Sequence, residues 1–259
     1  MYINVFGELQ DPVIVLIHPT MLTGEQLYQL FLPYFTGKYC FIAPDQGGHG
    51  KAGNYISADD EYAGLKQFLI ENNVTKVKLV YGASLGVTVA YRLFLDPSIE
   101  TEYGWFDGAA FSNGAPLWEW LAMSLFRREK KKQLKKHTDA LSMLKKMYGP
   151  EGAVTMTKNF DRLTLEDLEK ICHNYCSYKL RKLTADEQSR LHIDFGEKDF
   201  GLKRSKKSLP VYMPDADIKI RKGYAHCGYM SVHTEDYIRE IESFIKSTTL
   251  RQQKADHGT

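Results

Sequence analysis

Apolar residues follow two different spacings along the chain, and the two spacings alternate. Residues 13–17 form a continuous apolar run, which is typical of a strand buried on both faces of a parallel sheet. Residues 57–71 have helical spacing instead: Ser57 can cap the N-terminus, and Leu65 and Leu69 fall on one face. The alternation predicts an α/β fold with a mostly parallel central sheet flanked by helices.

These spacings also give the extent of each element and of one inserted region. Strands are expected at residues 2–6, 13–17, 39–43, 77–81, 106–112, 191–195 and 217–220, and helices at 25–35, 57–71, 85–95, 203–209 and 237–245. The alternation stops between residues 117 and 183, where helical segments at 118–147, 151–160 and 164–182 are rich in Lys and Met. We interpret residues 117–183 as an all-helical cap inserted into one domain, with residues 1–116 and 184–250 as its core. The polar residues 251–259 are expected to form a flexible tail.

Composition and charge favour a globular protein over several other classes. The chain has 259 residues, 43% hydrophobic and 25% charged, which suits one large domain with an insertion. Its net charge of +2 gives no overall attraction to nucleic acid, so no nucleic-acid partner is expected. No apolar run approaches the ~20 residues that span a bilayer, so stable membrane insertion is not expected.

The cysteines and the N-terminus bear on the cellular compartment. Cys40, Cys172, Cys176 and Cys227 lack the spacing of a disulfide framework, which indicates thiols in a reducing compartment. The N-terminus shows no basic segment followed by an apolar one, so no signal peptide is expected. We therefore expect a cytoplasmic protein that is a monomer or a homodimer.

The segment Gly82-Ala83-Ser84-Leu85-Gly86 matches the pattern G-x-S-x-G between a predicted strand and a predicted helix. In that context the serine lies at the apex of a sharp turn, and its hydroxyl projects from the sheet edge. Glycine is needed on either side where a Cβ would collide with the strand or the helix. Outside that context the same segment would be a Gly-rich turn with a surface serine.

Asp199 and His226 also follow predicted strands. Together with Ser84 they are expected at the carboxyl ends of the strands, where ligands bind in open parallel sheets. Two other carboxylates compete with Asp199, namely Asp194 within its strand and Glu197 just after it. The chain order Ser, Asp, His is the order of one known type of catalytic triad.

With these residues the chain resembles the α/β-hydrolase family over nearly its whole length. The matching segments are residues 18–20, 45–50, 82–86, 196–199 and 226–228. The resemblance implies a serine hydrolase in which Ser84 is the nucleophile, His226 is the base, and Asp199 orients the imidazole. Glu197 does not fit the family's G-x-x-D pattern, which Asp199 completes.

The resemblance also implies an oxyanion hole of two backbone N–H donors. One is expected from Leu85, the residue after the nucleophile. The other is expected from the loop after the early strand, at Thr20 or, as second choice, Met21. The family usually has Gly where this chain has Pro19, and proline has no N–H to donate.

The expected activity is that of a carboxylesterase, which cleaves a small or medium acyl ester through an acyl-enzyme and needs no metal or organic cofactor. The expected partner is a small ester-like molecule. The same triad also serves hydrolysis of C–C bonds, lactones, thioesters and aminoacyl amides, and haloperoxidase-type perhydrolysis, because the fold does not fix the substrate. A non-catalytic binding protein of this fold usually has a broken triad, and here all three residues are present.

Several other residues have structural and functional interpretations. His18 and His49 are expected to be structural. Cys172, His173 and Cys176 have helical spacing, but they lack the further ligands that a zinc site needs, so we expect packing thiols.

The predicted cap carries two further features. The basic run at residues 127–136 is expected to be a solvated helix face, with contact to anionic lipid as the alternative. Trp118, Trp120, Met123, Met143 and Met147 are candidates to line the pocket, of which Trp118 and Met123 are preferred.

Overall fold

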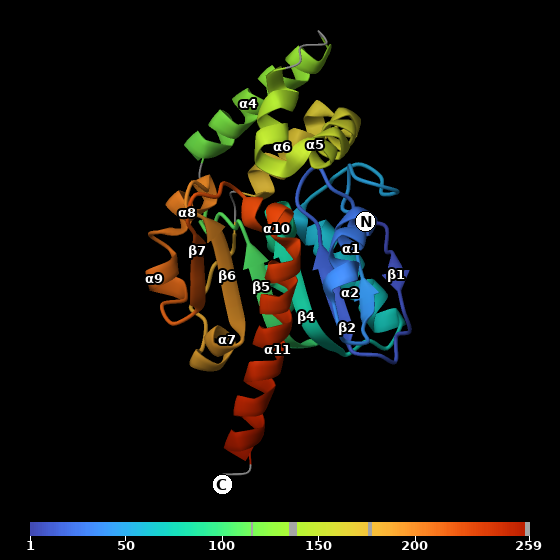
Figure 1. Ribbon diagram of the computed structural model, residues 1–259, viewed down its shortest axis with the longest axis vertical. Coiled ribbons are helices and arrows are strands. Elements are labelled where there is room, and N and C mark those ends of the chain that lie inside the picture. Colours follow the sequence, from blue (N-terminus) through green and yellow to red (C-terminus); the bar gives the residue numbers. More distant parts are fainter. Residues whose placement is uncertain (115, 135–138, 176–177, 257–259) are drawn as a thin grey trace.

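The computed structural model describes residues 1–114, 116–134, 139–175 and 178–256, with the backbone alone for residues 132–134, 139–144, 146–151 and 247–256. Its centre is a seven-stranded sheet in the order β1-β3-β2-β4-β5-β6-β7 (Figure 1). β1 pairs antiparallel with β3, and the other neighbouring strands pair in parallel. The predicted α/β fold with a mostly parallel sheet is confirmed.

The elements follow one another in the order that the alternating pattern indicates. The strands are β1 (Val5–Phe6), β2 (Val13–Ile17), β3 (Cys40–Ile42), β4 (Lys76–Ala83), β5 (Glu100–Asp107), β6 (Leu191–Gly196) and β7 (Asp217–Arg221). The helices are α1 (Gly24–Phe31), the 3-10 turn η1 (Leu32–Tyr34), α2 (Ala58–Glu71), α3 (Leu85–Phe94), α4 (Pro116–Leu134), α5 (Asp139–Arg162), α6 (Leu165–Tyr175), α7 (Ala185–Ser189), α8 (Phe200–Ser205), α9 (Leu209–Tyr212), α10 (Gly228–Val232) and α11 (Thr234–Asp256).

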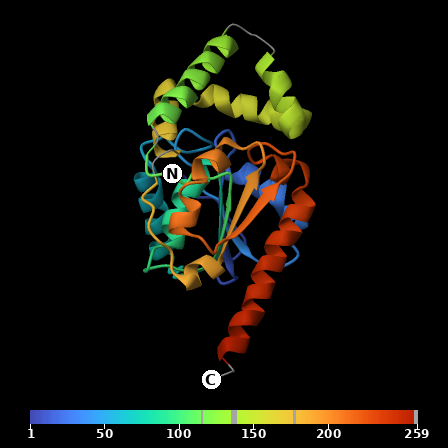
Figure 2. The same cartoon turned by 90° about the vertical axis from the view of Figure 1, so that its left-hand side faces the viewer.

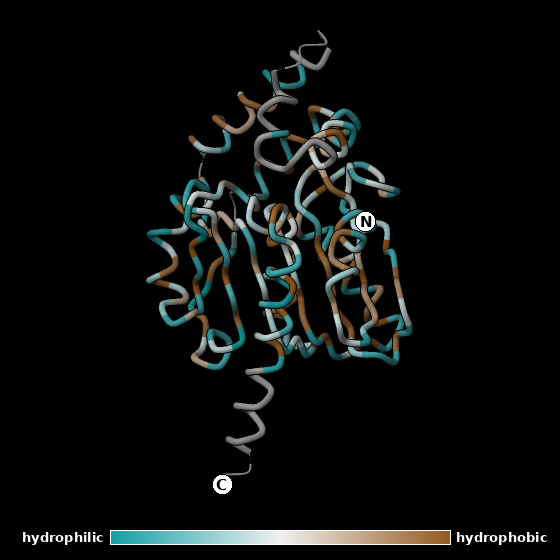
Figure 3. Tube along the Cα trace, in the orientation of Figure 1, coloured by the Kyte–Doolittle hydropathy of each residue, from teal (hydrophilic) through white to brown (hydrophobic). Residues whose placement is uncertain are grey.

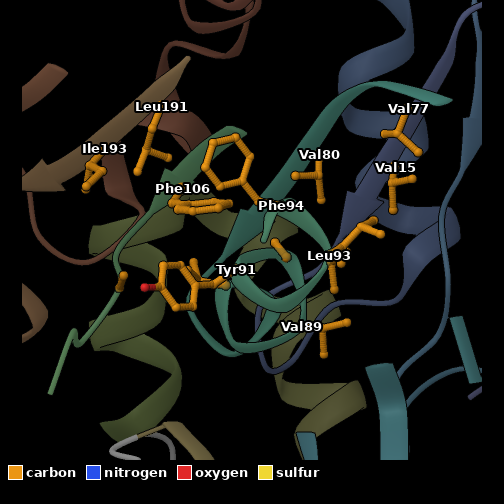
Figure 4. Packing of buried hydrophobic residues seen from close by; sticks show 14 of the residues in the cluster. Val15, Val77, Val80, Val89, Tyr91, Leu93, Phe94, Phe106, Leu191 and Ile193 are labelled. Atoms are coloured by element: carbon orange, nitrogen blue, oxygen red, sulfur yellow. The ribbon is translucent and has the colours of Figure 1, made fainter. Parts of the chain in front are cut away.

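Helices cover both faces of the sheet, which explains the continuous apolar runs in its strands. In β2, Val13, Val15 and Ile17 belong to an apolar cluster that includes side chains of α2 and α3. Ile14 and Leu16 point the other way, into a second cluster with side chains of α1 and α11. Figure 4 shows part of the first cluster, where side chains of the strands meet those of α3.

The largest error of the sequence prediction concerns β5. The strand was expected at residues 106–112, but β5 spans Glu100–Asp107. Gly108 has a φ of +67°, a left-handed conformation that ends the extended backbone. The apolar residues 109–111 that suggested a strand are buried beyond the end of the sheet.

Smaller differences occur near other element ends. Of the strand expected at residues 2–6, only Val5–Phe6 pairs with β3, while Tyr2 forms an isolated bridge to Asp45. The single helix expected at 203–209 is replaced by α8 and α9. α8 begins at Phe200 because the carboxylate of Asp199 accepts a hydrogen bond from the N–H of Gly201 and caps the helix.

The helices α4, α5 and α6 lie together beyond the carboxyl ends of the strands (Figures 1 and 2). The single helix expected at 118–147 corresponds to two helices, since α4 ends at Leu134 and α5 begins at Asp139. The helix expected at 151–160 is the second part of α5, and the one expected at 164–182 ends at Tyr175 as α6. Across the residues that the structure describes, no helix combines the length and the apolar character that crossing a membrane requires.

Candidate active site

Ser84 lies between β4 and α3 in a conformation that residues other than glycine rarely adopt, with φ 51° and ψ −116°. Its N–H donates to the carbonyl oxygen of Asp107 at 2.8 Å, which ties the turn to β5. A Cβ on Gly82 would lie 2.6 Å from the Cβ of Ala90, and one on Gly86 would lie 2.2 Å from a carbonyl oxygen of β2. Both glycines are therefore required by close contacts, as the G-x-S-x-G pattern predicts.

The structure brings Ser84, His226 and Asp199 together at the carboxyl ends of β4, β7 and β6. Nε2 of His226 lies 2.8 Å from Oγ of Ser84, and Nδ1 lies 2.9 Å from Oδ1 of Asp199. Asp199 is fully buried, and it also accepts from the N–H of Gly201 at 2.7 Å. The geometry suits the tautomer in which Nδ1 donates to the carboxylate of Asp199 and Nε2 accepts the hydroxyl hydrogen of Ser84.

The other two carboxylates weighed from the sequence have different partners. Asp194 is buried, and its Oδ1 accepts from Nε of Arg221 at 2.9 Å. Glu197 is exposed, and its Oε2 accepts from the N–H of Gly223 at 2.9 Å. Among the three candidates, Asp199 is the one whose carboxylate is hydrogen-bonded to the imidazole.

Asp107 is a further buried carboxyl group near the site, at the end of β5. Burial raises its pKa well above the ordinary range, and the nearby Asp194 and Asp199 raise it further. Its Oδ2 accepts a hydrogen bond from the hydroxyl of Tyr237 at 3.2 Å. This shift favours the neutral form of Asp107, which reduces the negative charge next to Asp199.

Gly108 makes room for the imidazole, a role that the sequence reasoning missed. A Cβ on Gly108 would lie 2.8 Å from Cε1 and 3.0 Å from Nδ1 of His226. The rings of Phe200 and Tyr175 flank the same imidazole, with centroids 5.1 Å and 6.2 Å away. The position of the His226 ring therefore depends on the absence of a Cβ at Gly108 on one side and on the aromatic rings of Phe200 and Tyr175 on other sides.

The two backbone N–H groups expected to form an oxyanion hole lie on α3 and on the loop after β2. Leu85 is the first residue of α3, where an N–H has no acceptor within the helix. In the loop, the N–H of Met21 donates to Nε2 of His49 at 3.3 Å. Because the N–H of Met21 already donates this hydrogen bond, Thr20 is the better candidate for the second donor of the oxyanion hole.

Both histidines near this loop are buried, and their hydrogen bonds fix a neutral tautomer. Nε2 of His18 accepts from the N–H of Gln46 at 3.0 Å, so its Nδ1 donates to the carbonyl oxygen of Pro19 at 2.8 Å. Burial lowers the pKa of His18 well below its ordinary value, and it also lowers the pKa of His49. The two side chains hold loops in place, in agreement with the structural interpretation.

Asn159 of α5 reaches the same loop and is the second residue that the sequence reasoning missed. Its Nδ2 donates to the carbonyl oxygen of Met21 at 2.9 Å and to Oε1 of Gln26 at 2.7 Å. Gln26 in turn closes a capping box with Thr23 at the start of α1. The helical segment thus holds the loop that carries Thr20.

The preferred pocket residues differ in their surroundings. Met123 is buried in an apolar cluster that contains Leu85 and Phe160, so it lies in the group of side chains next to the turn of Ser84. Trp118 is exposed, and its ring lies 5.7 Å from the guanidinium carbon of Arg204. The side chains of Met143 and Met147 lie outside the described residues.

The cysteine and histidine pair on α6 points in two directions. Cys172 is buried in the same apolar cluster as Met123, whereas His173 is exposed and its Nδ1 lies 3.1 Å from Oε1 of Glu119. Cys176 lies outside the described residues. Packing accounts for Cys172.

No protein-family model matches the chain, and no curated protein is significantly similar to it. Solved structures share its fold. They include a protein of the α/β-hydrolase family from Desulfitobacterium hafniense, with 19% identity over 94% of this chain and 99% of that one and a TM-score of 0.72. An esterase from Exiguobacterium antarcticum has 13% identity over 95% of both chains (TM-score 0.71), and a bromoperoxidase from Bacillus anthracis has 17% over 94% of both (TM-score 0.67). The chain has the α/β-hydrolase fold, and the resemblance noted from the sequence is confirmed at the level of the fold.

Proposed function

We propose that the protein is a serine hydrolase, most simply a carboxylesterase that acts on a small or medium acyl ester. The observation that carries the proposal is the hydrogen-bonded series from Ser84 through His226 to Asp199, with Oγ to Nε2 at 2.8 Å and Nδ1 to Oδ1 at 2.9 Å. A serine hydroxyl needs such a base, because it is a weak nucleophile while it keeps its proton. The fold likeness to an esterase supports the same chemistry.

Acylation begins when Oγ of Ser84 attacks the ester carbonyl carbon while its proton passes to Nε2 of His226. The carbonyl oxygen becomes an oxyanion, which the N–H groups of Leu85 and Thr20 stabilise, each donor being worth about 3 kcal/mol in related sites. Asp199 stabilises the imidazolium that has formed. The C–O bond then breaks, and the departing alcohol oxygen takes the proton from Nε2, which leaves an ester on Ser84.

Deacylation repeats the steps with water in place of the alcohol. His226 takes a proton from the water as its oxygen attacks the acyl carbon, and the second tetrahedral intermediate releases the acid. The proton returns to Oγ of Ser84, so the enzyme is restored without a cofactor. The helices α4–α6 act as a cap in this proposal, with Met123 in the apolar wall beside the acyl group.

A panel of p-nitrophenyl esters from acetate to decanoate, run with thioesters, lactones and aminoacyl amides, tests the proposal. The wild-type protein is expected to hydrolyse the shorter esters best, and Ser84→Ala is expected to remove that activity while the circular dichroism spectrum stays unchanged. Ester hydrolysis that persists in Ser84→Ala would exclude Ser84 as the nucleophile. A wild-type protein that cleaves another bond type but no ester would contradict the carboxylesterase assignment alone.

Perhydrolysis is a second candidate, and the fold likeness to a bromoperoxidase favours it. Hydrogen peroxide would attack the acyl carbon in place of water and release a peracid, and the proton would again return to Ser84. Bromination of monochlorodimedone in acetate, peroxide and bromide would detect the peracid. Bromination that Ser84→Ala does not reduce would argue against this route.

A further inference from the structure

Helix α4 has two apolar faces, one covered and one open. Met123, Ala122 and Phe126 face inward and join the apolar cluster that includes Phe160 of α5. Leu117, Leu121 and Leu125 recur every fourth residue on the opposite side, where Leu117 is 67% exposed and Leu125 is 61% exposed. A surface helix needs a single apolar stripe to pack on a core, so the outer stripe is unexplained by the fold.

Trp120 extends the outer stripe and is 64% exposed. Tryptophan is enriched where an apolar layer meets water, because its ring is large and apolar while its N–H can still hydrogen-bond. Together with Leu117, Leu121 and Leu125 it forms what we call the outer face of α4. Figure 3 shows that the apolar turns of α4 lie toward the sheet and the hydrophilic turns lie farther out.

Basic side chains follow the apolar turns along the same helix. Arg127 is exposed and forms an ion pair with Glu169, while Arg128 and Lys131 are exposed and by helical spacing continue the stripe of Leu117, Leu121 and Leu125. Lys130 faces inward instead, where its Nζ donates to the carbonyl oxygen of Asp161 at 3.1 Å. The outer face therefore combines an apolar half with a positively charged half.

The start of α4, from which the apolar half begins, contacts an element of the candidate active site. Trp118, next to it on α4, has its ring 5.7 Å from the guanidinium carbon of Arg204 on α8. One turn earlier on α8, the ring of Phe200 is 41% exposed and lies 5.1 Å from that of His226. The start of α4 therefore contacts α8, and the first residue of α8 lies beside His226.

We propose that the outer face of α4 binds an anionic lipid surface, with the Leu and Trp side chains in the headgroup–acyl boundary and the Arg and Lys side chains on lipid phosphates. A second copy of the chain fits this face less well, because it would add a face of the same positive charge. Adsorption of this kind differs from membrane insertion and requires no spanning helix. The proposal does not depend on Ser84 being a nucleophile, since binding is measured without turnover.

Cosedimentation of the full chain with vesicles tests the proposal. Phosphatidylglycerol vesicles are expected to bind the protein, and phosphatidylcholine vesicles at least about 10-fold less well, because the anionic headgroups attract the basic half. Leu125→Glu is expected to reduce binding to phosphatidylglycerol about 10-fold, since the apolar contact is lost. Ile70→Glu is the matched control, because Ile70 is 54% exposed on α2, away from α4.

The basic half is tested separately. The double variant Arg128→Gln, Lys131→Gln is expected to reduce binding to phosphatidylglycerol about 30-fold and to leave binding to phosphatidylcholine unchanged. Lys38→Gln with Lys219→Gln removes the same charge elsewhere and is expected to reduce binding far less.

Three results would overturn the proposal. They are absence of binding to both vesicle types, equal losses in Leu125→Glu and Ile70→Glu, and self-association that Leu125→Glu abolishes in a protein that binds no vesicles. The last result would assign the outer face to a second copy of the chain. Ester hydrolysis by a protein that binds no vesicles would contradict this proposal and leave the proposed function intact.

Discussion

Two parts of the molecule meet at Ser84: the carboxyl ends of the strands, which we call the sheet edge, and the helical segment α4–α6. Different kinds of contact fix the two parts in place. At the sheet edge, Ser84 and Asp199 are buried and fixed by backbone and side-chain hydrogen bonds within 3.0 Å. The helical segment α4–α6 is attached through a small apolar cluster and a few polar contacts, such as Asn159 to Met21 and Asp167 to the N–H of Tyr55. We infer that the sheet edge determines the reaction and the helical segment determines which molecules reach it.

Asp199→Asn gives the largest effect predicted for the sheet edge outside Ser84. An amide at this position can present its NH2 group to the imidazole and favour the wrong tautomer, so kcat is expected to fall about 10⁴-fold. The measurement is the rate of p-nitrophenyl ester hydrolysis. Glu197→Gln is the control, since Glu197 is an exposed carboxylate two residues away, and equal losses in both variants would remove Asp199 from its proposed role.

Gly108→Ala tests how tightly the imidazole position is fixed. The added Cβ would meet the ring of His226 at 2.8 Å, and displacement of a reacting group by about 1 Å can cost about 100-fold in rate. We therefore expect kcat to fall about 100-fold. Gly114→Ala is matched for backbone strain, because Gly114 also has a positive φ, +95°, but has open space around it. A Gly114→Ala variant as slow as Gly108→Ala would attribute the loss to strain.

Asn159→Ala tests whether the helical segment contributes to catalysis through the loop of Thr20. Removing the amide leaves the partly buried carbonyl oxygen of Met21 without this donor, and kcat is expected to fall about 10-fold with little change in KM. Asn174→Ala is the control, because Asn174 joins α6 to the N–H of Ala58, away from the loop. Equal effects of the two substitutions would mean that Asn159 supports only the fold.

His49→Gln is expected to give the smallest effect, which is a change in how the free energy of unfolding depends on pH. Burial lowers the pKa of His49, so below about pH 6.5 the unfolded chain binds more protons at this position than the folded protein does. The free energy of unfolding therefore falls as the pH drops through this range. The free energy of unfolding, measured in urea, is expected to fall between pH 7.5 and pH 5.5 by about 1 kcal/mol less in His49→Gln than in the wild type. Equal losses would mean that His49 titrates alike in both states.

The sheet edge could be predicted from the sequence, because strands and helices have distinct apolar spacings and parallel strands bring their carboxyl ends together. Ser84, Asp199 and His226 each follow such a strand, and the structure places their side chains in contact. β5 was misplaced, since its first residues are polar and the apolar residues 109–111 are buried outside the sheet.

The residues that support the site could not be predicted in the same way. Gly108 matters because its backbone faces the ring of His226, and Asn159 matters because it contacts Met21, 138 residues earlier in the chain. The spacing of apolar residues along the chain does not predict such contacts between residues far apart in the sequence. Trp118 and Met123 were equivalent as sequence candidates, and only packing separates the exposed side chain from the buried one.

Labelling with a fluorophosphonate tests the central claim most directly, because the reagent phosphonylates an activated serine without needing the right acyl group. The wild-type protein is expected to carry a single adduct, which peptide mass spectrometry places on Ser84, and His226→Ala is expected to react far more slowly because the base is missing. An adduct on another residue, or no adduct on folded protein, would contradict the claim that Ser84 is the activated nucleophile.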